Sequence, residues 1–381
     1  MGKRKRLGFV YLWDKNWLGG KYYAQNLFIA LKTLPEEKMP VINLYCTDET
    51  LFEEMKAGSG YPYLNKKIIK VSRIKRLFRL VLGFVNRNLS LCINEIDISP
   101  NEDVVFPYSR GHKKKRLIYW RPDFQEKYLP ENFSETDIRK RDQGIFDVCL
   151  RGIPIVFSSF DSERDFRKFF PNYTSHPTFV VHFAVSQPDF SGIDIDEIKE
   201  KYGIRKPYLF CANQFWKHKN HLFLFKVFKK MMDRNIDMQL LCTGRIYDNH
   251  NPDYIEDLKR YIKENQLEEK IITPGIIEKD EMMCLMKNSY AVVQPSLFEG
   301  WNTTIEDCKA MNKFVFLSNL EVHKEQIKEN CCFFDPHDED DLFDKLTTVK
   351  PTETYYNYEQ DVRLFGAEFY KVMEFVVSNI K

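Results

Sequence analysis

The first half of the chain alternates short apolar runs with longer segments of mixed character. The apolar runs predict strands at 7–12, 41–46, 104–108, 117–119 and 155–158. A turn at 17–20 precedes a segment with helical periodicity at 22–34. Short strands separated by helices are typical of a parallel sheet.

The second half repeats this alternation. The predicted strands are 208–212, 239–243, 271–273, 290–293, 314–318 and 332–334, and the predicted helices are 222–233, 254–265, 280–288, one around Cys308, and 362–379. We therefore expect an α/β protein with two doubly wound, Rossmann-like domains that face each other across a cleft. The expected domains are 1–185 and 186–360, with the linker within 180–196, and the helix at 361–381 packs back on the N-terminal domain.

Composition narrows the class of protein. With 381 residues, 43% of them hydrophobic, the chain can bury two cores. A net charge of +2 and the lack of a recognition motif argue against nucleic acid as a partner. Nine scattered Cys without zinc-type spacing favour a reducing cytosol. No apolar run approaches the ~18 residues of a spanning helix, and the N-terminal apolar stretch does not resemble a signal peptide.

The segment 295–307 (P-S-L-F-E-G-W-N-T-T-I-E-D) joins a predicted strand to a predicted helix. Such a junction presents free backbone N–H groups that bind anions. Its acids, Glu299, Glu306 and Asp307, accept hydrogen bonds from hydroxyl groups. A ligand that carries both phosphates and hydroxyls on one scaffold is a nucleotide sugar.

Three segments resemble one enzyme family. The sequence E-G-W-N-T-T-I-E-D-C-K at 299–309 is similar to the E-G-W-S-T-x-x-E-[ED]-A-K variant of an E-x7-E motif. The loop N-Q-F-W-K-H-K-N at 213–220 resembles the first loop of the same family's C-terminal domain, and W-R-P-D-F-Q-E-K-Y-L-P at 120–130 resembles its W-I-P-D-F-Q-H-x-x-L-P acceptor segment. The chain thus resembles the retaining, GT-B-fold glycosyltransferases of family 4, also called group 1.

The resemblance assigns roles on the donor side. Glu299 would contact the donor sugar and stabilise charge at the reacting carbon, and Lys219 would neutralise the diphosphate. Many members carry an Arg where this chain has Gln214, and Lys217 is a candidate to compensate. The alternatives are an acid favoured by a helix N-terminus for Glu299 and a solvated loop lysine for Lys219.

The start of the helix supplies further donor contacts. The backbone N–H groups of Asn302, Thr303 and Thr304 would cradle the distal phosphate with help from the Thr hydroxyls, a role that is compatible with plain N-capping. Gly300 is a further candidate donor-binding residue.

The second acid of the motif would bind the ribose. The register selects Asp307, and Glu306 is the alternative. Their side chains point ~100° apart on a helix, so one of them should face the cleft.

In the N-terminal domain, Gly19 and Gly20 resemble the family's glycine turn, which approaches the donor phosphate. They do not form G-x-G-x-x-G, which argues against a dinucleotide enzyme.

On the acceptor side, Asp123 would orient or deprotonate the acceptor hydroxyl, or else it caps the next turn. The chain departs from the family pattern here. Pro122 stands where related members carry a His before the Asp, Arg121 replaces an apolar residue, and Glu126 stands at the His of the W-I-P-D-F-Q-H variant.

The stretch from Lys56 to Asn94 contains no acid, and basic and apolar residues alternate from Lys66 to Arg87. One interpretation is contact with an anionic membrane or a lipid-diphosphate acceptor. The other is a core helix with a basic surface, because basic residues at every third position drift ~60° per step on a helix. The basic run 113–116 adds to either patch.

Together these observations predict a cytoplasmic, retaining, metal-independent hexosyltransferase without a cofactor. It would use UDP-, GDP- or another nucleoside-diphosphate sugar and a glycan or lipid-linked acceptor, in bacterial surface polysaccharide synthesis. Contact with the inner face of the membrane stays open. Two alternatives remain: a non-catalytic, nucleotide-binding partner subunit with the same fold, and a sugar-nucleotide epimerase.

Overall fold

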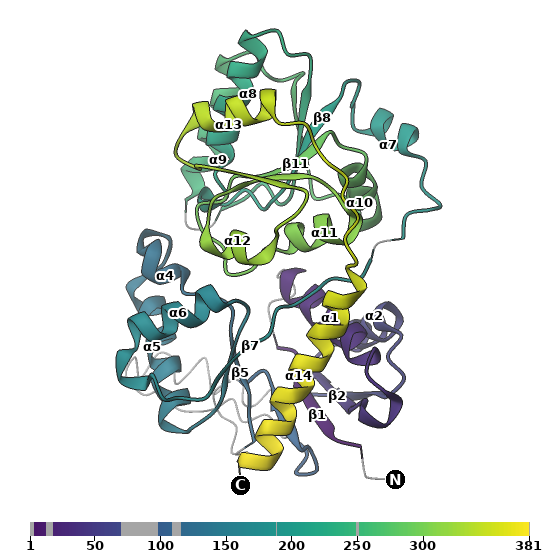
Figure 1. The fold of residues 1–381 in the computed structure, drawn as a ribbon, viewed down its shortest axis with the longest axis vertical. Helices are drawn as coiled ribbons and strands as arrows, with labels where there is room; N and C mark the ends of the chain where they lie inside the picture. The colour runs from purple at the N-terminus through teal and green to yellow at the C-terminus, as the bar shows by residue number, and fades with distance from the viewer. Residues whose placement is uncertain are drawn as a thin grey trace, which may run out of the picture.

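The computed structural model describes residues 4–12, 18–69, 98–108, 116–187, 189–248 and 251–380. These residues form two α/β halves, with the N-terminal half below and the C-terminal half above in Figure 1. The chain passes upward between β7 and α7 and returns to the lower half in α14. Every strand pair of the described residues is parallel.

The N-terminal half holds two sheets, of order β3-β2-β1-β4 and β5-β6-β7. Their strands are β1 (Arg6–Val10), β2 (Val41–Cys46), β3 (Leu64–Ile68), β4 (Val104–Phe106), β5 (Tyr119–Arg121), β6 (Ile155–Phe157) and β7 (Thr178–Val180). A parallel bridge between Val105 and Leu117 makes the two sheets adjoin along β4. The helices of this half are α1 (Leu18–Lys32), α2 (Glu49–Ser59), α4 (Gln125–Tyr128), α5 (Glu135–Leu150) and α6 (Phe160–Phe169), with short 3-10 turns η1 (Glu36–Lys38), η2 (Pro130–Asn132) and η3 (Pro171–Tyr173).

The C-terminal half is built on one six-stranded sheet of order β10-β9-β8-β11-β12-β13. Its strands are β8 (Tyr208–Ala212), β9 (Gln239–Thr243), β10 (Ile271–Gly275), β11 (Ala291–Gln294), β12 (Val315–Ser318) and β13 (Cys331–Phe334). The helices are α7 (Ile195–Lys201), α8 (His221–Asp233), α9 (Pro252–Glu264), α10 (Lys279–Lys287), α11 (Thr303–Met311), α12 (Glu321–Gln326) and α13 (Glu339–Thr348), with the 3-10 turn η4 (Lys217–Lys219). The strand order reverses between β8 and β11, which is the point where doubly wound sheets bind ligands at their carboxyl ends.

The last helix, α14 (Glu359–Asn379), lies against α1 in the N-terminal half (Figure 1). Phe365, Phe369 and Met373 of α14 are fully buried in the core of the N-terminal half, to which α1 also contributes. The two helices approach closely at Gly366, where a Cβ would lie 2.2 Å from the carbonyl oxygen of Ala30. The absence of a side chain at Gly366 therefore permits this packing.

The structure also corrects details of the predicted elements. Gly19 and Gly20 lie in the first turn of α1 rather than in a turn before it. The strand expected at 117–119 is centred two residues later, in β5. Short strands β3 and β7 were not predicted, because β3 is polar for most of its length and β7 has only three residues.

The basic segment from Lys66 to Arg87 is described only as far as Ile69. Lys66, Lys67 and Ile68 belong to β3, so a surface helix that begins at Lys66 is wrong for these residues. The rest of that segment, and residues 113–115, lie outside the described residues. Among the helices in the described ranges, none combines the length and apolarity needed to cross a bilayer.

Candidate functional site

The carboxyl ends of β8 and β11 bring two loops of opposite charge together. The loop after β8 carries Lys219, and the loop after β11 carries Glu299. The backbone N–H of Leu297 donates to the carbonyl of His218 over 2.8 Å, which ties the loops to each other. As a result, Lys219 Nζ lies 2.6 Å from Glu299 Oε1.

Glu299 is a buried carboxylate, since its side chain is 9% exposed. Burial alone would raise its pKa, but the positive charge and hydrogen bond of Lys219 oppose burial, and the net effect is a lowered pKa. The side-chain amide of Asn302 also donates to Glu299 Oε1, over 2.9 Å. Glu299 is therefore held as an anion in one orientation. Next to this pair, burial and the charge of Lys219 lower the pKa of His218 to about 3, so this ring is neutral.

Asn302 is the N-cap of α11, and its side-chain oxygen accepts from the N–H of Ile305 over 3.2 Å. The Asn302 N–H donates to the side chain of Gln326 over 3.2 Å, so this N–H already has a partner within the protein. The first turn of a helix leaves N–H groups without intrahelical partners, and here these are the N–H groups of Thr303 and Thr304. The Thr304 hydroxyl donates to the carbonyl of Ala212 at the end of β8, over 3.1 Å.

The two neighbouring acids of α11 have different surroundings. Glu306 is 1% exposed and accepts hydrogen bonds from Gln326 (2.8 Å), Tyr358 (2.6 Å) and Lys309 (3.2 Å). It also lines a pocket of about 390 Å³ between the 182–184 linker segment, α11 and α14. The hydrogen bonds of Glu306 therefore join α11 to α12, through Gln326, and to the C-terminal segment, through Tyr358.

Asp307 is 6% exposed. Burial raises its pKa to about 7, although Lys279 opposes this effect. Lys279 Nζ lies 4.5 Å from the ring centre of Tyr22 in α1, so this part of the site lies at the contact between the two halves.

The segment at 120–130 meets the loop after β11, which carries Glu299 and Gly300, directly. A Cβ on Gly300 would lie 2.6 Å from the carbonyl oxygen of Pro122 and 2.7 Å from the Cβ of Asp123. Asp123 therefore lies beside the Glu299–Gly300 loop, although 176 residues separate Asp123 from Glu299 in the sequence. Asp123 Oδ1 also accepts from the N–H of Gln125 over 3.0 Å, so the expected turn cap is present as well.

Arg121 and Glu126, the two charged residues that depart from the family pattern, are in contact with each other. The guanidinium of Arg121 donates to Glu126, and both side chains are buried, at 6% and 0% exposure. Arg141 lies 3.3 Å from the second oxygen of Glu126. Glu126 therefore belongs to a buried ion-pair cluster that supports the acceptor segment.

The remaining predicted residues, Gly19, Gly20, Gln214 and Lys217, differ in burial. Gly19 is exposed and Gly20 is buried at the N-terminal end of α1. Gln214 is half-buried, and its carbonyl accepts from the N–H of Trp216 over 2.8 Å. Lys217 is exposed, and its backbone N–H donates to Asp248 over 2.9 Å.

Sequence reasoning missed Gln326 and Tyr358, which hold Asn302 and Glu306. No local pattern distinguishes a buried glutamine or tyrosine with this role from one in an ordinary core.

Residues 194–360 match the sequence model of the family described as Glycosyl transferases group 1. The O-antigen chain mannosyltransferase RfbU of Salmonella typhimurium is 26% identical over 169 residues, which are 44% of this chain and 43% of the relative. The aligned segment thus spans less than half of either protein. Both findings support a group 1 glycosyltransferase.

Solved structures resemble nearly the whole chain. A glycosyltransferase from Rickettsia africae has a TM-score of 0.63 at 15% identity and covers 98% of this chain and 96% of its own. Anabaena HepE in complex with UDP and glucose has a TM-score of 0.62 at 13% identity, over 97% and 95%. WaaG, a glycosyltransferase involved in lipopolysaccharide biosynthesis, has a TM-score of 0.57 at 10% identity, over 98% and 99%. The chain therefore has the GT-B fold.

Proposed function

We propose that this protein is a retaining, metal-independent glycosyltransferase that moves a sugar from a nucleoside-diphosphate sugar to a glycan or lipid-linked acceptor in surface polysaccharide synthesis. The observation that carries the proposal is the Lys219–Glu299 pair beside the start of α11, at the switch point of the C-terminal sheet. The group 1 match over residues 194–360 and the mannosyltransferase relative support the reaction class.

The proposed donor lies along α11. Its distal phosphate would accept from the N–H groups of Thr303 and Thr304, and Lys219 would neutralise the charge that develops as the sugar–phosphate bond breaks. Glu299, held as an anion, would stabilise the positive charge that grows on the anomeric carbon. Its orientation is set beforehand by Lys219 and Asn302, so little reorganisation accompanies the reaction.

For the ribose we propose Asp307 rather than Glu306. Glu306 is 1% exposed, and both of its carboxylate oxygens already accept hydrogen bonds, from Gln326 of α12 and from Tyr358 of the C-terminal segment. Burial raises the pKa of Asp307, and the hydroxyl groups of a bound ribose would donate to its carboxylate and favour the charged form.

On the acceptor side we propose Asp123, because the contact of Gly300 with Pro122 and Asp123 places it next to Glu299. An acceptor hydroxyl between Asp123 and the anomeric carbon would attack on the face that the leaving group occupies, which is the retaining geometry. The proposed location is cytoplasmic, near the inner face of the membrane, where lipid-linked acceptors are found.

The first experiment measures thermal stability with UDP, GDP, ADP and their sugars, on the wild type and on Lys219→Ala. A ligand at about 100 times its Kd should add about 2.7 kcal/mol of stability. A shift with one nucleotide that is lost in Lys219→Ala supports the donor site and identifies the base. No shift with any nucleotide contradicts the proposal.

Turnover then separates the reaction classes. Transfer to an acceptor, with the product's anomeric configuration equal to that of the donor by NMR, supports a retaining transferase. Nucleotide binding without donor cleavage would instead indicate a non-catalytic subunit, and release of an epimerised sugar without an acceptor would indicate an epimerase.

A further inference from the structure

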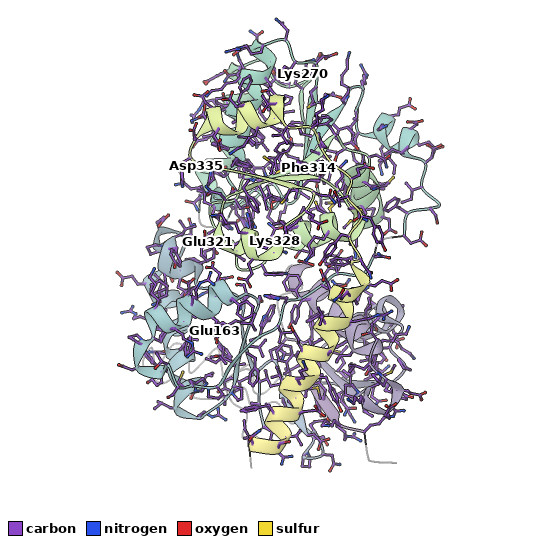
Figure 2. The ribbon with its side chains drawn as sticks, viewed as in Figure 1. Glu163, Lys270, Phe314, Glu321, Lys328 and Asp335 are labelled. Atoms are coloured by element: carbon purple, nitrogen blue, oxygen red, sulfur yellow. The ribbon has the colours of Figure 1, made fainter. Side chains whose placement is uncertain are left out.

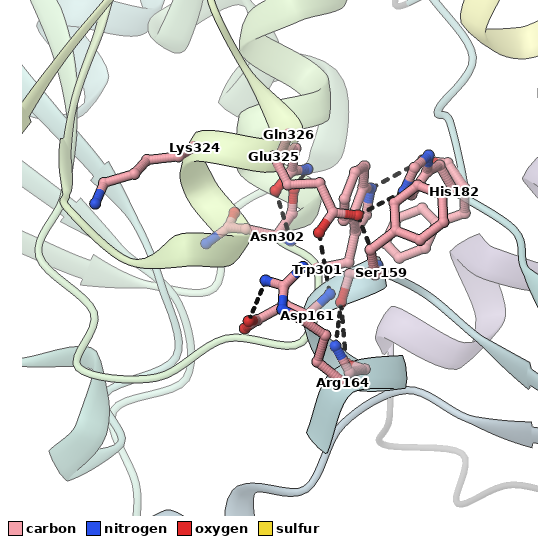
Figure 3. Close-up of polar contacts among 12 residues, drawn as sticks. Ser159, Asp161, Arg164, His182, Trp301, Asn302, Lys324, Glu325 and Gln326 are labelled. Atoms are coloured by element: carbon pink, nitrogen blue, oxygen red, sulfur yellow. Dashed lines mark hydrogen bonds and ion pairs between the residues drawn. The ribbon is translucent and has the colours of Figure 1, made fainter. Parts of the chain in front are cut away.

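The carboxylate of Glu325 joins the two halves of the molecule. Glu325 belongs to α12 in the C-terminal half, and its Oε1 and Oε2 accept from the backbone N–H groups of Phe160 (2.7 Å) and Asp161 (3.1 Å) in the N-terminal half. His182 in the linker places Nε2 2.7 Å from the same carboxylate. Figure 3 shows Glu325 pointing from α12 toward Asp161 and His182.

These contacts complete the N-terminus of α6. The hydroxyl of Ser159, the N-cap, accepts from the N–H of Ser162 over 3.0 Å. Within the first turn of α6, the N–H groups of Phe160 and Asp161 then still need acceptors. The carboxylate of Glu325, from the other half, accepts from both. A carboxylate at a helix N-terminus is favoured by the helix dipole, and the side chain of Glu325 is 14% exposed, so solvent screens this interaction weakly.

From α6 the contacts lead to the acceptor segment. The Ser162 hydroxyl donates to the carbonyl of Pro122 over 2.9 Å. Pro122 and Asp123 in turn lie against Gly300 of the catalytic loop.

From α12 the contacts lead to the catalytic loop itself. Gln326, next to Glu325, donates to the carbonyl of Asn302 over 2.8 Å and accepts from its N–H over 3.2 Å. Asn302 donates to Glu299. These contacts form a ring across the junction between the two halves. One side runs from Glu299 through Asn302 and Gln326 to Glu325. The other side runs from Glu325 through α6 to Pro122 and Asp123, which lie against Gly300 and close the ring.

A second contact holds the linker next to this ring. The rings of His182 and Trp301 stack, with centroids 4.5 Å apart and planes 12° apart. The Trp301 indole donates to the carbonyl of Phe183 over 3.1 Å. Trp301 directly follows Gly300, so the linker and the catalytic loop are held to each other. Figure 2 shows Glu321, the first residue of α12, and Lys328, which follows α12, at the margin of the upper half that faces Glu163 of α6.

We propose that Glu325 is a positioning residue that holds the Pro122–Asp123 acceptor segment against the Glu299–Gly300 loop by capping α6 from the opposite half. Its importance for the reaction rests on the proposed function above. The nucleotide is bound within the C-terminal half, so loss of Glu325 should reduce the rate of transfer while nucleotide affinity is retained. A misplacement of about 1 Å between reacting groups can reduce the rate about 100-fold.

Glu325→Gln tests this role, because it preserves size and removes the charge and one acceptor. The matched control is Glu321→Gln on the same helix, whose exposed carboxylate pairs with Lys324. Hydrogen exchange of peptides that contain residues 160–161 and 121–127 reports on the ring without any need for turnover. We expect faster exchange in both peptides for Glu325→Gln and wild-type exchange for Glu321→Gln.

In the activity arm, Glu325→Gln should lower kcat for transfer by about 10- to 100-fold with an unchanged nucleotide Kd. Ser162→Ala should lower kcat in the same way and speed exchange only in the 121–127 peptide, because Glu325 still caps α6. Wild-type exchange in both peptides of Glu325→Gln overturns the inference whether or not any nucleotide binds. A loss of nucleotide affinity as large as the loss of kcat also overturns it, since Glu325 would then act inside the donor site. Failure of every nucleotide to bind the wild type overturns the proposed function instead, and the exchange results still decide the role of Glu325.

Discussion

The ammonium of Lys219 lies 2.6 Å from the carboxylate of Glu299, and both side chains are largely buried, at 13% and 9% exposure. One group suits the negative charge of a departing diphosphate, and the other suits the positive charge of a reacting sugar carbon. Each compensates the charge of the other, because removal of either would leave its partner as an uncompensated buried charge.

Lys219→Ala should lower kcat/KM by about 100-fold or more, through loss of charge stabilisation in the transition state. It should also raise the pKa of Glu299, because burial would then act with less opposition. Since the reaction needs ionised Glu299, the acidic limb of the pH–rate profile should move to higher pH. An unmoved limb would contradict the pairing. Lys226→Ala is the control, because Lys226 is an exposed lysine that pairs with Glu339.

Asp307→Asn should weaken nucleotide binding and change the pH dependence of stability. The pKa of Asp307 is about 7 in the folded protein, against an ordinary value of 3.8. The folded state therefore holds a proton that the unfolded state releases between about pH 4 and pH 7, and stability falls as the pH rises through this window. The variant lacks this cost and should melt higher than the wild type at pH 8, with a smaller difference at pH 4. Melting scans at both pH values decide the point.

Glu306→Gln is the counterpart of that experiment. Gln326, Tyr358 and Lys309 would lose a charged acceptor, and the buried ammonium of Lys309 would keep Asp361 as its ion-pair partner. We expect a loss of about 1–3 kcal/mol in the free energy of unfolding, measured by urea denaturation. Nucleotide affinity should remain within a few-fold of wild type at a temperature where the variant is folded. A large specific loss of affinity would transfer the ribose role to Glu306.

Gly300→Ala should impair transfer through a clash between the halves. The new methyl group would lie 2.6 Å from the Pro122 carbonyl oxygen and 2.7 Å from the Asp123 Cβ, so the acceptor segment must move. We expect kcat to fall about 100-fold while nucleotide binding persists. Gly192→Ala has open space around its Cβ and serves as the control. Steady-state kinetics and nucleotide titration measure both quantities, and a wild-type kcat would show that this contact is dispensable.

The buried pair of Arg121 and Glu126 should act on stability. Glu126→Gln leaves the buried guanidinium of Arg121 without its anion, which costs about 3–5 kcal/mol. Replacement of both residues, by Arg121→Met with Glu126→Leu, removes both charges and should destabilise the protein less than the single change. Denaturation of the single and double variants tests this order, and a double variant that is less stable than Glu126→Gln would contradict it.

Local sequence patterns predicted much of the C-terminal half. β8 and β9 have the same bounds as the strands predicted at 208–212 and 239–243. Strands that are buried on both faces have continuous apolar sequences, which are easy to recognise. The N-terminal half was less predictable. β3 carries exposed lysines, so it has the polarity of a loop, and β7 is only three half-buried residues long, which is too short for a periodic pattern.

The sequence by itself determined that this chain builds two α/β halves on parallel sheets, and that the candidate acid Glu299 stands where a strand meets a helix, since both features depend on residues close together in the chain. Tertiary structure decided which neighbours these residues have. Glu306 is bound by Gln326 and Tyr358, which lie 20 and 52 positions away, and Asn302 gives its N–H to Gln326. Arg121 and Glu126 compensate each other as a buried pair, and Glu325 caps a helix in the other half. These contacts join segments that only the packed fold brings within hydrogen-bond distance, and no periodicity along the chain encodes them.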